Sequence, residues 1–139
     1  MSLSNPSSVA SFDAEAVRET IENSIEGTLR SLVEYDEMTF NPLYVDDLTL
    51  SFYDDEDHMM AHFERIHSYI HIDFTEMNLF TDELFPATDR VRYLATGFDM
   101  FTLLRVYIDG EGLFLALDPN EPIEPLVQAI EGALLETNE

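Results

Sequence analysis

Four histidines in the middle of the chain are the residues best suited to metal chemistry. His58 and His62 form one i, i+4 pair, and His67 and His71 form another. On a helix the two pairs project to nearly opposite sides, so all four cannot converge on one ion. His67 and His71 together with Glu64 could still offer zinc two imidazoles and a carboxylate. No HExxH motif is present to place a general base, and the alternative is that these histidines pair with nearby acids beside an apolar stripe.

Two arginines near the carboxyl end are the next candidates. If a hairpin turn is centred on Phe98 and Asp99, Arg92 lies directly opposite Arg105 on an antiparallel ladder. Like charges in that position are unfavourable unless a negative group lies between them. In so acidic a chain the expected partner is an internal carboxylate. The alternative is a bound anion such as a carboxylate or phosphate, which would make Arg92 and Arg105 a ligand-binding pair.

Other catalytic chemistry is missing from the sequence. It contains no Gly-rich phosphate loop, nucleophile elbow or kinase signature. Without cysteine there is no disulfide, thiol nucleophile or Cys-ligated zinc, and without lysine there is no Schiff base. Neighbouring acids are so frequent that a pair of them says nothing about acid–base catalysis. We therefore expect no catalytic residue and no cofactor, and the sequence favours a non-enzymatic role; the alternative left open is an enzyme that uses His67 or His71.

The charge of the chain is its strongest compositional feature. Twenty-nine Asp and Glu face six basic residues, all arginine, for a net charge of −23 over 139 residues. Self-repulsion of this size opposes folding in dilute buffer, whereas at molar salt the Debye length falls to about 3 Å. The composition is typical of a halophilic protein that works in high monovalent salt. It also argues against nucleic-acid binding, and without an apolar span or signal segment it indicates a cytoplasmic protein without membrane contact.

The length and the apolar share of 45% predict a single globular domain. Residues 1–12 are rich in Ser, Asn and Pro and are predicted to be flexible. Residues 13–136 are predicted to form one α+β domain, in which an antiparallel sheet of an edge hairpin and a three-stranded meander is covered by helices on one or both faces.

The predicted meander runs from Arg90 to Asp118 and organises the rest of the domain. Turns at Phe98–Asp99 and at residues 109–112 would pair Leu104 with Tyr93 on one side and with Leu117 on the other. One face then carries a typical core. The opposite face is too apolar to lie in water, and we predict that part of it forms an interface, with these residues contributing: Leu94, Phe101, Leu103 and Phe114.

Helix signals flank this sheet. Asp13 is a predicted N-cap, followed by an apolar stripe from Val17 to Leu32 at helical spacing. Residues 35–53 are interpreted as the edge hairpin, and a helix is predicted to begin at Asp54. Periodicity leaves residues 67–75 open between helix and strand. A short helix over residues 73–86 could cover the second sheet face, and an amphipathic helix after Pro122 closes the chain.

The order helix, hairpin, helix, three-stranded meander, helix resembles that of roadblock and profilin-like sensor domains. The resemblance is one of topology, from Asp13 to Leu135, and implies dimerisation through sheet edges or helix faces and regulation of a partner such as a small GTPase. Composition and the segment from Tyr107 to Pro119 also resemble small acidic haloarchaeal proteins. We therefore expect a non-catalytic regulatory or protein-interaction module, working as a homodimer or with a protein partner; a small-ligand sensor that uses the arginine pair is the alternative.

Overall fold

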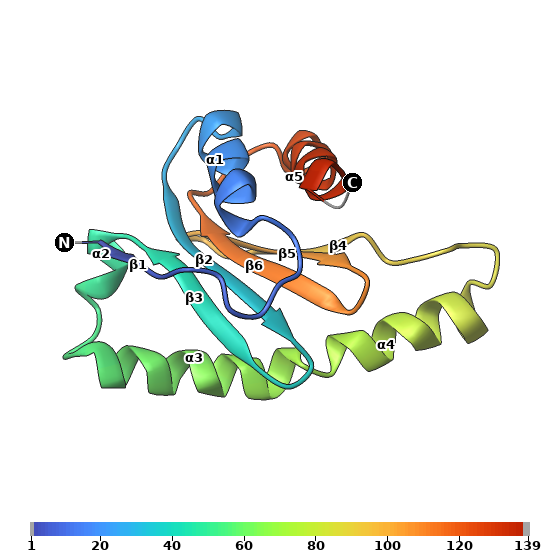
Figure 1. The fold of residues 1–139 in the computed structure, drawn as a ribbon, viewed down its shortest axis with the longest axis horizontal. Helices are drawn as coiled ribbons and strands as arrows, with labels where there is room; N and C mark the ends of the chain where they lie inside the picture. The colour runs from blue at the N-terminus through green and yellow to red at the C-terminus, as the bar shows by residue number, and fades with distance from the viewer. Residues whose placement is uncertain (1, 138–139) are drawn as a thin grey trace.

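A computed structural model describes residues 2–137, which form one antiparallel sheet between two helical layers (Figure 1). The strands are β1 (Leu3–Ser4), β2 (Leu29–Asp36), β3 (Phe40–Val45), β4 (Tyr93–Gly97), β5 (Thr102–Ile108) and β6 (Glu111–Leu117), in the spatial order β1-β3-β2-β6-β5-β4. The helices are α1 (Ala14–Ser24), α2 (Asp47–Leu50), α3 (Glu56–Ile70), α4 (Asp73–Leu79), the π-helix η1 (Phe80–Leu84) and α5 (Ile123–Thr137). The predicted α+β class, with an antiparallel sheet covered by helices, is confirmed.

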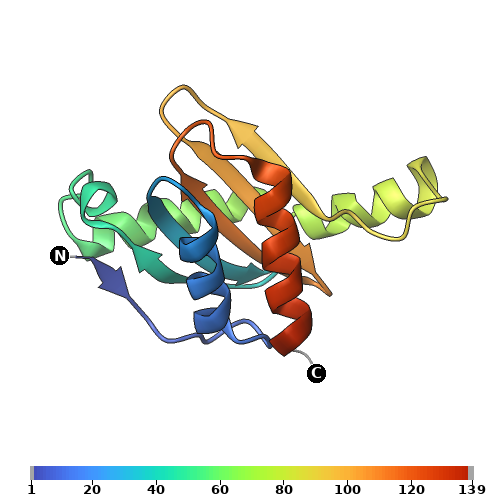
Figure 2. The same ribbon diagram turned by 90° about the horizontal axis from the view of Figure 1, so that it is seen from above.

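Helices α1 and α5 lie side by side on one face of the sheet (Figure 2). The predicted cap of α1 is present, because Asp13 accepts a hydrogen bond from the amide of Ala16. Val17 and Ile21 are completely buried, as is Ile130 of α5. Burying each such side chain stabilises the fold by about 1.5–3 kcal/mol, so this layer forms the main core.

The first helix is shorter than predicted, and the hairpin after it lies earlier in the chain. Helix α1 ends at Ser24, while Leu29 and Leu32, which continue its spacing, belong to strand β2. This strand lies between β3 and β6 and is buried on both faces, so it has no alternation to reveal it. The hairpin is β2–β3, and the alternation of Leu48 and Leu50 falls in the short helix α2 instead of a strand.

Strand β2 also holds a carboxylate that the sequence did not single out. Glu34 is completely buried and accepts four hydrogen bonds of 2.6–2.8 Å. The donors are the Ser7 hydroxyl, the Ser8 and Ala10 amides and the Asn41 side chain. Burial alone would raise the pKa of Glu34, but these hydrogen bonds outweigh it and hold the pKa below its usual value.

The hydrogen bonds to Glu34 hold the amino-terminal segment against the sheet. Where the sequence predicted a flexible stretch over residues 1–12, the structure has strand β1 paired with β3 and the residues after it tied to Glu34. Residue 1 lies outside the described residues. Serine-rich composition did not reveal this, because the acceptor lies far along the chain in a strand. The segment covers the β3 edge of the sheet.

The three-stranded meander is present with a register displaced by two residues. Asp109 and Gly110 both have positive φ, 47° and 81°, and form a tight two-residue turn. As a result Leu104 pairs with Leu115 instead of Leu117. In the other hairpin Gly97 pairs with Thr102 across the loop at residues 98–101, so Leu104 pairs there with Ala95 instead of Tyr93. The predicted register is therefore wrong. The predicted assignment of side chains to the two faces is still correct, because a shift of two residues leaves every side chain on its own side of the sheet.

Helices α3 and α4 cover part of the second face. Asp55 caps α3 by accepting from the His58 amide, and Met59, Phe63 and Ile70 are buried beneath the helix. Residues 73–79 form α4, so the segment left open by periodicity is largely helical. Helix α4 covers only part of the sheet. It continues into η1 and extends past the sheet (Figures 1 and 2).

Candidate interaction surface

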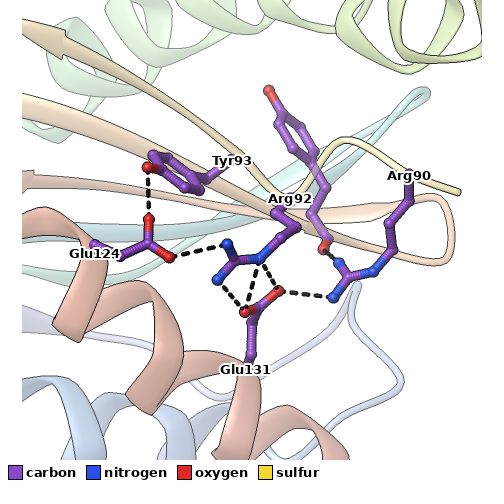
Figure 3. Close-up of polar contacts among 6 residues, drawn as sticks. Arg90, Arg92, Tyr93, Glu124 and Glu131 are labelled. Atoms are coloured by element: carbon purple, nitrogen blue, oxygen red, sulfur yellow. Dashed lines mark hydrogen bonds and ion pairs between the residues drawn. The ribbon is translucent and has the colours of Figure 1, made fainter. Parts of the chain in front are cut away.

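Arg92 does not face Arg105, as the displaced register already implies. Arg92 precedes β4 and turns towards α5, where its guanidinium binds Glu131 at 2.7 Å and Glu124 at 2.9 Å (Figure 3). Arg90 binds the same Glu131 carboxylate at 2.7 Å. The hydrogen bond from Arg92 lowers the pKa of Glu131, and the one from Tyr93 is the main cause of the lowered pKa of Glu124. This cluster fastens the start of β4 to α5.

Arg105 is paired on the other side of the sheet. It donates at 2.6 Å to Asp73 at the start of α4, and the same carboxylate oxygen accepts from the Tyr107 hydroxyl at 2.6 Å. Across the ladder, Arg105 faces Leu94 and not Arg92. Both arginines bind internal carboxylates, but these are separate groups on different elements and not, as was predicted, one acid shared between the two arginines. The structure brings no shared anion site together from them.

The histidines are also used within the fold. The His62 Nδ1 is 2.7 Å from the Tyr53 hydroxyl, and His67 Nε2 is 2.8 Å from the carbonyl oxygen of Asp36. The rings of His67 and His71 lie 6.0 Å apart between centroids, and Glu64 is exposed. Among residues 2–137 no cluster of three or more His, Asp or Glu side chains could hold a metal ion.

The four predicted interface residues form a gradient of burial on the second face. Phe114 is buried, with its ring against that of Phe63 in α3 at 6.4 Å. Leu103 and Phe101 are half-buried, and Leu94 on the edge strand is 37% exposed. The sheet is thus covered by α3 at its centre and left open towards β4.

A groove of about 630 Å³ lies where this cover stops. Its walls come from strands β2, β5 and β6, from α2 and the residues after it, from α3 and from the loop at residues 98–101. Phe98 in that loop is 49% exposed and stacks on Phe101 at 4.8 Å. The lining residues include no Asp or Glu, although a fifth of the chain is acidic. The groove is therefore an apolar patch on a strongly acidic protein, which marks it as a candidate interaction site.

Strand β4 adds an unpaired backbone edge beside the groove. Phe98 donates to the carbonyl of Phe101, and Tyr107 donates to that of Arg92, so the even-numbered residues of this segment bond to β5. The amides and carbonyls of Tyr93, Ala95 and Gly97 consequently point away from the sheet. In the described chain the opposite edge, at β3, is covered by β1. An exposed edge strand is a template for pairing with another chain.

Fold and surface together define an α+β domain whose β4 edge, five residues long, is exposed beside an apolar groove. Three solved structures share the fold. A roadblock/LC7 domain from Streptomyces avermitilis has 10% sequence identity and a TM-score of 0.59, with 94% of this chain and 96% of that chain covered. An MglB with a tetrameric arrangement has 14% identity and a TM-score of 0.57, covering 96% and 97% of the two chains, and the gliding protein MglB from Thermus thermophilus has 13% identity and a TM-score of 0.53, covering 95% and 98%. The predicted roadblock resemblance is confirmed at the level of fold.

The chain belongs to the family described as Domain of unknown function (DUF7522), whose model matches residues 15–135. No curated protein matches the sequence. In the described part of the chain, none of the helices has both the length and the apolar character needed to cross a membrane.

The sequence indicated the apolar second face and, in general terms, a sheet edge, but it did not identify β4 as that edge or reveal the buried polar cluster around Asp73. Asp73 lies in the segment 67–75, which the sequence left undecided between helix and strand. The position of its carboxylate, and therefore its pairing with Arg105, could not be predicted. The orientation of the β4 amides depends on register, which was displaced. A signal for the correct turn was present in Asp109–Gly110, the dipeptide favoured in two-residue hairpins.

Proposed function

We propose that this protein is a non-catalytic regulatory module that works as a homodimer joined through the free edge of β4. The observation that carries the proposal is the coincidence, at one edge, of unpaired backbone groups and exposed apolar side chains. Pairing two copies of β4 antiparallel would satisfy the outward amides of both chains and shield Leu94.

The distribution of charge supports the same edge. Residues 93–104 contain a single acid, Asp99, in a chain with a net charge of −23. Two copies repel one another over most of their surface, and least where acids are missing. In molar salt the repulsion is screened beyond about 3 Å. We infer that the dimer forms in the cytoplasm of a cell with high internal salt.

The fold supports a regulatory role more than a catalytic one. Domains of the roadblock fold in the comparison include an MglB described in a tetrameric arrangement, and the resemblance implies a protein partner such as a small GTPase. In the proposed dimer the α1/α5 layer of both copies lies on the side of the sheet away from α3 (Figure 1). That layer remains free to meet such a partner.

The experiment is sedimentation in molar KCl with two variants of Ala95. The native chain should sediment as a dimer of two 15.9 kDa chains. Ala95→Pro removes one outward N–H but no bond to β5, and should shift the protein to monomer because proline is tolerated at an edge yet cannot donate. Ala95→Val keeps the N–H and should remain dimeric. A native chain that is monomeric at every concentration would refute the proposal.

Anion sensing through Arg92 and Arg105 stays a separate prediction. The carboxylates that already bind both guanidinium groups weigh against it. A melting shift with phosphate that disappears in the double variant Arg92→Gln/Arg105→Gln would support it.

A further inference from the structure

We propose that in the dimer an apolar arm of each copy docks in the groove of the other. The arm is defined as residues 79–85, the end of α4 with η1 and Phe85. This inference rests on the proposed dimer and adds a second, separately testable contact to the β4 edge.

The arm is a surface without cover in the single chain. Leu79, Phe80, Leu84 and Phe85 are 42–58% exposed, and the rings of Phe80 and Phe85 stack on each other at 6.1 Å instead of on the sheet. Large apolar side chains gathered at the tip of a projecting segment are typical of a contact with another molecule. Figures 1 and 2 both show this segment beyond the sheet.

Arm and groove match in apolar character, and the groove lining holds no acid that would repel the arm. The arm carries two exposed acids, Asp82 and Glu83, for which residues 2–137 provide no ion-pair partner. The lining of the groove includes no acid; its Arg30 is already paired with Asp118 at 2.9 Å, and His58 Nδ1 accepts from the Asp54 amide at 3.0 Å. A chain with a net charge of −23 has few such places to receive an acidic segment. The second copy is therefore the occupant that the observations favour.

The arm cannot reach the groove of its own chain. The α3 residues that line the groove run from His58 to Ile66, and the arm follows the far end of that helix and all of α4. The chain from Ile66 to Leu79, at the start of the arm, is largely helical and spans roughly 20 Å at 1.5 Å per residue. The contact must therefore join two molecules.

The β4 pairing brings the two surfaces together. In an antiparallel pair centred on Ala95, Tyr93 of one copy faces Gly97 of the other. Residues 86–92 connect the arm to Tyr93, and Gly97 leads directly into Phe98, which lines the groove. Because arm and groove lie on the same face of the sheet, a two-fold axis through the β4 pair makes both contacts at once.

Site-specific crosslinking tests this arrangement, and a chain without cysteine offers a clean background. Phe85→Cys and Phe98→Cys are made in separate chains that differ by an affinity tag, mixed in molar KCl and treated with a short bismaleimide. The expected product is a covalent dimer of one chain of each kind. The control replaces Phe98→Cys by Leu135→Cys, an exposed position on α5 over the opposite face, and should give no such product.

A second measurement is the dimer dissociation constant of the double variant Leu84→Ser/Phe85→Ser. Losing two apolar contacts should weaken the dimer at least about tenfold, while Leu135→Ser leaves it unchanged. A native dimer that gives no crosslink between positions 85 and 98, or whose Kd does not change in the arm variant, overturns the arm contact and leaves the β4 dimer standing. A monomeric native chain refutes the dimer itself.

Discussion

Replacing Asp73 by alanine should separate α4 from the sheet at a large cost in stability. Asp73 is 5% exposed, and its Oδ2 accepts from both Arg105 and Tyr107 at 2.6 Å. The alanine variant leaves the guanidinium of Arg105, whose side chain is 17% exposed, without a counter-charge. Breaking a buried pair in this way costs about 3–5 kcal/mol, a large share of the roughly 5–15 kcal/mol typical of a small domain.

The assay is urea unfolding in molar KCl at one protein concentration, followed by circular dichroism, with the two single variants and their combination. We expect Asp73→Ala and Arg105→Met each to lower the unfolding free energy strongly. The double variant Asp73→Ala/Arg105→Met should be less destabilised than the two single effects added together, because no unpaired charge remains. The expected coupling energy is about 2 kcal/mol or more.

The matched control is the ion pair between Arg18 and Glu22 on α1, at 2.8 Å with side chains 31% and 45% exposed. Glu22→Ala should cost no more than about 0.5 kcal/mol, because water screens this pair. If Asp73→Ala costs as little as Glu22→Ala, or if the effects at positions 73 and 105 simply add, the argument that this pair fastens α4 to the sheet is wrong.

Three further outcomes are expected. Glu34→Gln should lower the free energy of unfolding by about 2–4 kcal/mol at neutral pH. Because the folded-state pKa of Glu34 is lowered, its contribution to stability is present above the unfolded pKa near 4.3 and is lost as pH falls through the folded pKa. Stability of the variant should therefore fall less steeply in acid than that of the native chain, whereas Glu37→Gln, at an exposed position, should match the native chain. Gly112→Ala should destabilise by about 1–3 kcal/mol, since a Cβ there would lie 2.7 Å from the Tyr35 ring, and unchanged denaturation midpoints would contradict this. Circular dichroism in dilute buffer should show partial or full unfolding that molar KCl reverses; full structure without salt would remove the halophilic interpretation.

The sequence could predict those elements whose signals are local. The cap at Asp13, the stripe at Val17 and Ile21 and the acidic start of α3 all correspond to observed helices. The faces of the meander were predicted correctly because alternation has a period of two, and the displacement of both hairpins was also two. Local chemistry was sufficient in each of these cases.

What the sequence could not predict depends on partners distant in the chain. Strand β2 is buried on both faces, so Leu29 and Leu32 carried no strand periodicity and were assigned to the preceding helix. Glu34 is a charge in the middle of that strand, and its donors come from residues 7–10 and from Asn41. Nothing local distinguishes such an acid from the many on the surface.

Amide hydrogen exchange along β4, resolved by residue in molar KCl, tests the dimer most directly. The amides of Leu94 and Thr96 face β5 and should be protected in any folded state. Those of Tyr93, Ala95 and Gly97 face outward, so only pairing with a second chain would protect them. We predict slow exchange at all five positions. Slow exchange at 94 and 96 with fast exchange at 93, 95 and 97 would contradict the account, because the edge would then be open to water.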